Sequence, residues 1–227
     1  MGHFVGGLQV FVVVLAAVPL VAACARSASG EELARVTAPR LRLVWIDVLD
    51  SAPYAFPDAT REASAILAGA GVETVWTHGE ASTVTDADEL KVVLMGGPAR
   101  GAHLPERVMG GARRGAQSQT AWIYLSNVIW ALGIQDRGSR GFSAREQEEI
   151  ARALGRVVAH ELVHAVAPDI PHSRTGLMAD TMGRSLLLQR NLSLAPAEQA
   201  ALRAGVAGPW SPVAAVSTPV VLTAVRR

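Results

Sequence analysis

The sequence predicts an α/β fold, in which helices cover a β-sheet around one core. Stretches rich in β-forming residues alternate with stretches whose apolar residues recur at helical spacing. Of the 227 residues, 50% are hydrophobic and 18% are charged, a balance that suits a well-buried core and argues against disorder. We therefore expect a single domain of ordinary size, with its longest helix underneath the sheet.

The first part of the domain predicts the order strand, helix, strand, strand. Residues 41–48 (LRLVWIDV), 73–78 (ETVWTH) and 90–95 (LKVVLM) are rich in β-branched and other apolar residues, so each predicts a strand. Between the first two strands, residues 57–71 carry apolar side chains at helical spacing and end at glycines, which predicts a helix.

The middle of the chain predicts a further strand and a long helix. Residues 100–118 are rich in glycine and arginine and fit either a short edge strand or a loop. The apolar run 121–132 (AWIYLSNVIWAL) predicts a strand. Ser143 and Glu146 have the spacing of a capping box, which predicts the start of a long helix that ends before Pro168.

A small helical part follows the long helix. Residues 196–204 (PAEQAALRA) predict a closing helix, whereas the apolar, proline-interrupted tail 211–227 predicts no particular element. We accordingly place the folded domain at 41–210, after a linker at 25–40.

The first 24 residues indicate export. Residues 10–23 form an unbroken apolar stretch that is short for a spanning helix and ends in small residues, as in a secretory signal. The sequence VAAC, ending at Cys24, resembles the lipobox of bacterial lipoproteins, in which the cysteine is acylated. Cleavage without lipidation and an uncleaved membrane anchor are the alternatives. We expect either a secreted protein or a cell-envelope lipoprotein attached to the membrane by an N-terminal lipid.

Charge and cysteine content exclude several classes of function. The net charge is +1 and no cluster of lysine and arginine is present, so nucleic acid is not expected as a partner. Cys24 is the only cysteine, so neither an intrachain disulfide nor a cysteine-based zinc or iron–sulfur site can form. Histidine and carboxylate side chains must therefore hold any metal.

The long helix carries a motif that suits a metal. His160 and His164 are four residues apart, so their side chains leave the same helix face one turn apart. Two imidazoles in that arrangement reach one Zn²⁺ at about 2.0–2.1 Å each. Glu161 lies beside the pair, where it can accept a proton from the attacking water, as HExxH motifs do. Such polar residues are costly to bury in an apolar helix unless they bind something.

A possible third ligand follows the helix, because His172 comes soon after Pro168 and precedes Gly176-Leu177-Met178. Together with HExxH, this stretch resembles the active site of the metzincin clan of zinc peptidases, and more narrowly matrixin-like bacterial proteins. The resemblance implies one zinc ion held by His160, His164 and His172, with Glu161 as the catalytic residue and Met178 in the Met-turn beneath the metal. It also implies a metzincin-like twisted sheet with two long helices, one of them the active-site helix carrying HExxH, and a small C-terminal helical subdomain.

The chain departs from the clan pattern at the third ligand. The clan's glycine and third histidine would fall at Ala167 and Ile170, so His172 comes two residues late. We favour His172 because it aligns as a unit with the following turn, and keep Asp169 as the alternative, since carboxylate oxygen also suits zinc. Asp180, just after the turn, is expected to hydrogen-bond the turn or a ligating imidazole.

The predicted function is that of an exported zinc-dependent endopeptidase acting on peptides or proteins. One rival is an exported or lipid-anchored zinc-binding protein without hydrolytic activity, and another is an exported domain with no metal. Glu161 favours the enzyme, because a purely structural zinc site has no use for a glutamate that is not a ligand. His78 and His103 stand alone in the sequence and are expected to lie outside the site. No oligomeric state is predicted.

Overall fold

The structure is a computed structural model, in which Thr37–Arg227 forms one compact unit. Cys24, the expected signal and nearly all of the expected linker lie outside the described residues, as does His103. No helix within the described part of the chain is long and apolar enough to cross a membrane. The described residues are 38–86, 88–97, 107–114, 119–135, 141–208 and 220–224.

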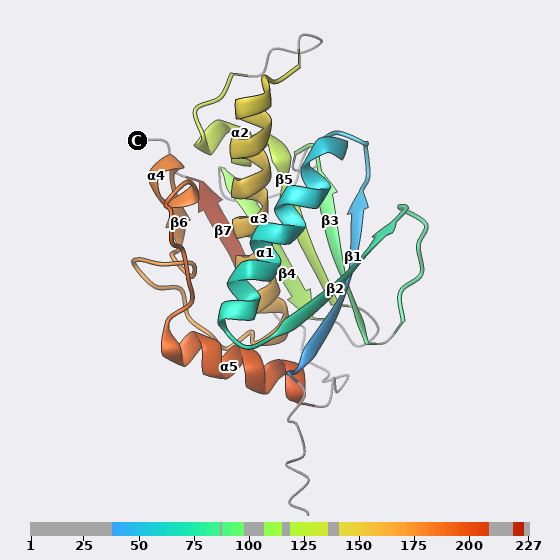
Figure 1. Cartoon of the computed structure of the whole chain (residues 1–227), viewed down its shortest axis with the longest axis vertical. Coiled ribbons are helices and arrows are strands. Elements are labelled where there is room, and N and C mark those ends of the chain that lie inside the picture. The colour runs from blue at the N-terminus through green and yellow to red at the C-terminus, as the bar shows by residue number, and fades with distance from the viewer. Residues whose placement is uncertain are drawn as a thin grey trace, which may run out of the picture. The chain divides into compact units, whose positions relative to one another are not determined.

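The described strands form one mixed sheet of seven strands in the order β2-β1-β3-β5-β4-β7-β6 (Figure 1). The pairs β1–β2, β1–β3 and β3–β5 are parallel. Strand β4 runs antiparallel to both β5 and β7, and β6 is parallel to β7. The strands are β1 (Arg40–Asp47), β2 (Glu73–Gly79), β3 (Glu89–Met95), β4 (Val108–Arg114), β5 (Gln119–Tyr124), β6 (Thr181–Met182) and β7 (Val220–Ala224).

Two long helices, α1 (Phe56–Gly69) and α3 (Ala144–Val166), pack side by side against the sheet (Figure 1). Helix α1 contacts β2, and α3 lies along β4 and β5. The predicted α/β class, with two long helices and a small helical C-terminal part, is therefore confirmed. The shorter helices are η1 (Pro53–Ala55), α2 (Leu125–Ala131), α4 (Arg184–Leu187) and α5 (Pro196–Ala207).

The ends of α3 are those that the sequence predicts. The Ser143 hydroxyl accepts a hydrogen bond from the Glu146 amide at 3.3 Å, and the Ser143 amide donates to the Glu146 carboxylate at 2.8 Å. Both halves of the capping box are thus present at the first turn. The helix ends at Val166, two residues before Pro168.

The prediction of one strand over 121–132 is wrong. The strand ends at Tyr124, and α2 begins at Leu125 and continues to Ala131. A continuous apolar run does not by its periodicity distinguish a buried strand from a buried helix. Within α2, the buried side-chain amide of Asn127 donates to the Val108 carbonyl at 2.5 Å and so ties the helix to β4.

Two regions without a definite prediction contribute strands. Part of the segment 100–118 forms β4 over Val108–Arg114, so this part is a strand and not a loop. It is not the expected edge strand, because β4 is paired with β5 on one side and with β7 on the other. From the tail 211–227, Val220–Ala224 forms β7 and enters the sheet between β4 and β6.

Helices α1 and α3 approach closely at Gly155, where a Cβ atom would lie 2.5 Å from the Ala59 carbonyl oxygen. A glycine inside a helix normally destabilises it by about 1 kcal/mol relative to alanine. At this position the clash of the new methyl group with the Ala59 backbone outweighs the higher helix propensity of alanine. Gly155→Ala is therefore expected to lower the free energy of unfolding by about 1–3 kcal/mol. The measurement is chemical denaturation, with Gly69→Ala as the matched control.

Gly69 is the last residue of α1, and a Cβ atom there would have no neighbour within 4 Å. Gly69→Ala is therefore expected to leave stability unchanged or to raise it by up to about 1 kcal/mol. Equal effects of the two substitutions would contradict the close helix contact at Gly155.

Candidate metal centre

The last turns of α3 place two histidines in the interior. His160 is fully buried, and His164 is 2% exposed. The helix around them is apolar, with Val157, Val158 and Leu162 all in the core. The spacing of four residues brings both imidazoles to one side of the helix, with ring centroids 4.8 Å apart.

A short loop returns the chain to these histidines. After α3, the Ile170 amide donates to the Ala167 carbonyl at 3.1 Å and closes a turn around Pro168. The Ser173 amide then donates to the Met178 carbonyl at 2.7 Å, and the Asp180 amide donates to the Ser173 carbonyl at 3.1 Å. These hydrogen bonds close a tight turn just after His172 and so fix the backbone position of His172.

Gly176 makes this turn possible because its φ is +79°, a conformation that other residues rarely adopt. The backbone conformation of the turn thus explains why the motif Gly176-Leu177-Met178 begins with a glycine.

The three Nε2 atoms of His160, His164 and His172 converge on one point. They lie 3.2 Å apart for His160 and His172, 3.1 Å for His160 and His164, and 3.0 Å for His164 and His172. Three nitrogens at about 2.0–2.1 Å from a tetrahedral zinc ion would be about 3.3 Å apart. The three histidines therefore form a group suited to binding zinc.

The three imidazoles are held in the neutral form that ligation requires. Burial, followed by the neighbouring His164, lowers the pKa of His160 to about 3. Burial and the neighbouring His172 lower the pKa of His164 to about 4. The pKa of His172 is also lowered by burial, and the nearby Asp180 carboxylate opposes this shift.

A hydrogen bond that His160 donates to the turn sets the tautomer of its imidazole. Its Nδ1 lies 2.7 Å from the Leu177 carbonyl oxygen, which can only accept, so Nδ1 carries the proton. The Nε2 lone pair is then directed at the other two histidines. Such a bond from the second ring nitrogen to a carbonyl is the usual way in which proteins orient a ligating histidine.

Glu161 is fully buried, yet neither of its carboxylate oxygens has a hydrogen-bond partner among the described residues. Burial raises its pKa well above the ordinary value. A buried carboxyl group without a partner is costly to a fold, and in native proteins such a group calls for a missing ligand, water or catalytic role. Glu161 therefore fits a site that is completed by a metal and its water.

Strand β4 makes room for Glu161 through Gly110. A Cβ atom at Gly110 would lie 2.9 Å from Oε1 of Glu161 and 2.9 Å from the Trp122 carbonyl oxygen. The backbone of β4 thus runs directly against the glutamate of the motif. This residue was missed by the sequence reasoning, because nothing local in 100–118 indicates which helix its strand would contact.

The other sequence candidates have different surroundings. Met178 is fully buried. Among the described residues that can ligate a metal, the group contains His172 and not Asp169. Asp180 is exposed and influences His172 through its charge. His78 is exposed in β2, with its ring centroid 5.3 Å from that of Phe56, and does not belong to the histidine group.

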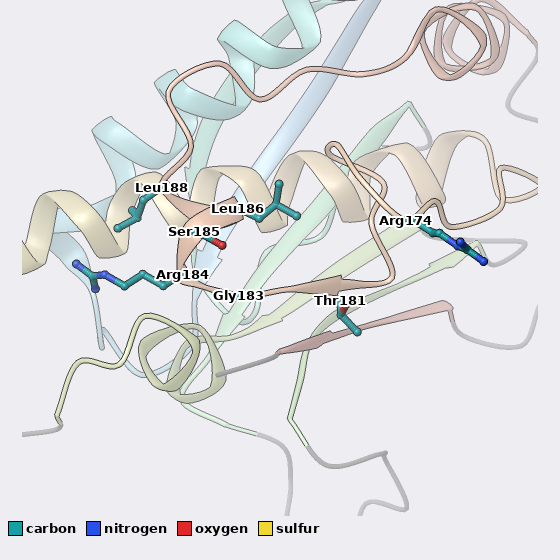
Figure 2. A pocket seen from close by; sticks show the side chains of 7 residues that line it. All are labelled: Arg174, Thr181, Gly183, Arg184, Ser185, Leu186 and Leu188. Atoms are coloured by element: carbon teal, nitrogen blue, oxygen red, sulfur yellow. The ribbon is translucent and has the colours of Figure 1, made fainter. Parts of the chain in front are cut away.

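A pocket of about 620 Å³ begins just beyond the turn. It is formed by the turn, β6 and α4, and Figure 2 shows Arg174 and Arg184 at its opposite ends with Thr181 and Gly183 between them. The Arg184 guanidinium bonds the Leu132 carbonyl and is 2.7 Å from the Glu149 carboxylate. None of the three histidines lines this pocket.

Two solved structures are similar to this fold. Archaemetzincin from Methanopyrus kandleri is 11% identical, with a TM-score of 0.48, over 74% of this chain and 96% of that one. A zinc-dependent peptidase from Methanocorpusculum labreanum is 12% identical, with a TM-score of 0.47, over 71% of this chain and 99% of that one. No family model matches the chain, and neither does any curated protein. The functional proposal therefore rests on the site residues themselves.

Proposed function

We propose that the chain is a zinc-dependent peptidase, with His160, His164 and His172 as the metal ligands and Glu161 as the catalytic base. The observation that carries this proposal is the combination of three converging neutral imidazoles with a buried carboxylate that has no partner. The buried carboxyl group of Glu161 costs the fold free energy without a partner, and the convergence of three imidazoles on one point has no purpose in packing alone.

Three ligands favour a catalytic site over a structural one. Structural zinc sites are usually closed by four protein ligands, whereas catalytic sites use three and keep one position for water or substrate. The group in the described part of the chain offers three. His172 is its most exposed member, so the approach from solvent lies on that side.

The chain's own groups then have distinct tasks. When bound, zinc supplies Lewis acidity that lowers the pKa of water to about 7 and polarises a peptide carbonyl. Glu161 accepts the proton of the attacking water and later delivers it to the leaving amine. Burial raises the pKa of Glu161, which favours uptake of the proton from the attacking water.

The test of this proposal is removal and return of the metal. The chelator-treated chain is expected to lose turnover of a mixed peptide library and to regain it on addition of about one zinc ion per chain. Zinc at 100 times its dissociation constant should also stabilise the fold by about 2.7 kcal/mol, measured as a shift of thermal unfolding.

Two other outcomes of this test would be informative. Zinc uptake without any turnover would leave a non-hydrolytic zinc-binding protein. A folded chain that takes up no zinc would refute the metal site.

We further propose that the protein acts outside the cytoplasm, either lipidated at Cys24 or secreted. The apolar segment 10–23 and the following VAAC sequence support this. Mass spectrometry of the mature N-terminus separates the cases, since a diacylated Cys24, a free N-terminus after a small residue and an intact leader differ in mass.

A further inference from the structure

The sheet has two ends, and β2 forms the end opposite to β6. Among the described residues, β2 pairs with β1 on one side and with no strand on the other. The parallel ladder to β1 runs without a register shift from Glu73 to Gly79. Strand β2 therefore presents a free edge of backbone groups, to which a further strand can be added.

Three residues of β2 direct their backbone groups to this free edge. The Glu73 amide donates to the Pro39 carbonyl just before β1 at 2.9 Å, so the backbone groups of Glu73 face β1. Successive residues of a strand direct these groups to opposite edges, so those of Thr74, Trp76 and His78 face outwards. Proteins usually protect such an edge with proline, lysine or a bulge, and β2 has none of these.

Helix α1 covers one face of β2 and leaves space beside the edge. The Ser64 hydroxyl lies 2.7 Å from that of Thr74 and accepts a hydrogen bond from the Trp76 indole at 2.9 Å. This side of α1 therefore lies over β2. Ala65 and Ala68, the exposed residues nearest to Ser64 along α1, are small and bring no long side chain to the edge.

The opposite face of β2 is exposed. Its side chains are those of Glu73, Val75 and Thr77, which alternate with the residues that face α1. Val75 is 42% exposed, which is unusual for a large hydrophobic residue of the described chain. An exposed valine between two other exposed residues, on a strand with a free edge, suits contact with another strand.

We infer that the free edge of β2 binds the same edge of a second copy of the chain, in an antiparallel pair centred on Trp76. The inference does not depend on the proposed peptidase function. A dimer of this kind is symmetric, because the same surface of each chain contacts the other. It joins the two sheets at their β2 ends and leaves the β6 end of each sheet outside the contact.

A pair centred on Trp76 uses every outward backbone group of β2. Trp76 then lies opposite Trp76 of the second copy, and Thr74 lies opposite His78 of the second copy. These are the hydrogen-bonded positions of an antiparallel ladder, at which two opposed residues exchange both of their N–H···O bonds. The pair would therefore form about six hydrogen bonds between the chains. A shifted register would leave an outward residue of β2 without an opposing one.

The side chains that meet in this register are compatible. Val75 lies opposite Thr77 of the second copy on the outer face, and the symmetric pair lies beside it. Four β-branched side chains therefore cover one another, an arrangement that stabilises strand pairs. Glu73 lies opposite Gly79 of the second copy, so no like charges face each other. The Glu73 carboxylate is already paired with Arg40 of its own chain at 3.1 Å.

The first test places charges at the two outer positions of the full chain. Val75→Lys/Thr77→Lys sets lysine opposite lysine, and Val75→Glu/Thr77→Glu sets glutamate opposite glutamate. Each variant alone is expected to associate with itself at least about 100-fold more weakly than the unmodified chain, because like charges across a contact repel. An equimolar mixture of the two variants is expected to restore the dimer. The measurement is sedimentation velocity over a range of protein concentrations.

Two further variants complete this test. Leu49→Lys is the matched control, because Leu49 is exposed and apolar but lies in the loop after β1, and it is expected to leave association unchanged. Val75→Glu/Thr77→Lys sets opposite charges against each other and is expected to dimerise by itself, so the test remains valid if a like-charged variant does not fold.

Three results would overturn the inference. The first is an unmodified chain that stays monomeric throughout the concentration range. The second is a mixture of the two like-charged variants that stays monomeric. The third is undiminished association of both like-charged variants. All variants keep the same N-terminal segment, so this third result would place the contact on that segment or on another surface.

A second measurement needs no substitution. The amides of Thr74, Trp76 and His78 face the free edge, whereas those of Val75 and Thr77 face β1. Raising the concentration of the full chain is therefore expected to slow hydrogen exchange at the first three amides at least about tenfold and to leave the other two unchanged. Exchange that is independent of concentration at all five amides would refute the contact.

Discussion

Glu161→Gln is expected to lower peptide turnover by about 10²–10⁴-fold while the chain still binds one zinc ion, the range expected when a general acid–base group is lost. The amide has the shape of the carboxyl group, so the space beside Gly110 stays filled. It cannot accept the proton of the attacking water, which is the step that we propose for the buried carboxylate of Glu161.

The measurement is kcat/KM on a peptide substrate, with zinc per chain determined on the same samples. Glu148→Gln is the matched control, because Glu148 is an exposed glutamate on the same helix. We expect this control to keep full turnover. Undiminished turnover in zinc-loaded Glu161→Gln would contradict the role of Glu161, whereas loss of zinc together with turnover would mean that Glu161 supports the metal and not the proton transfer.

The parts of the site that the sequence predicted are those determined locally. The capping box at Ser143, the helical spacing of His160 and His164 and the break at Pro168 all act within a few residues, and α3 forms as they predict. The spacing of four residues alone is enough to bring two imidazoles to one face of a helix.

The position of His172 depends on the path of the loop after α3, and the number of residues between His164 and His172 does not determine that path. His172 and Asp169 are three residues apart, and both follow the same proline. The turn closed by Ser173 and Met178 is what brings the chain back at His172. Which of the two residues faces the helix is therefore a consequence of hydrogen bonds made beyond both of them.

The parts that the sequence did not predict depend on contacts between distant segments. Gly110 matters because β4 runs against Glu161, about fifty residues later in the chain. Helix α2, which follows β5 within one apolar run, is tied to another strand by the hydrogen bond from Asn127 to Val108. Strand β7 depends on two edges, β4 and β6, that the rest of the chain must first bring together. Propensity is a weak guide where pairing of this kind decides the structure.

The second large effect concerns the metal itself. His172→Ala is expected to weaken zinc binding by at least about 100-fold, because loss of even an outer partner of a metal ligand lowers affinity by about 10–100-fold, and His172 is proposed as a direct ligand. Its Nε2 lies 3.2 Å from that of His160 and 3.0 Å from that of His164, so no described ligand replaces it. The measurement is competition for zinc with a chromophoric chelator.

Two matched substitutions make this measurement decisive. Asp169→Asn removes the rival carboxylate and is expected to leave zinc affinity unchanged, because Asp169 is outside the histidine group of the described chain. His78→Ala removes an exposed histidine on β2 and should also have no effect. The opposite result is a loss of zinc affinity of about 100-fold or more in Asp169→Asn and none in His172→Ala. It would mean that the loop places the Asp169 carboxylate, and not the His172 imidazole, at the metal. The site would then have two nitrogen ligands and one oxygen ligand, an arrangement that catalytic zinc also accepts.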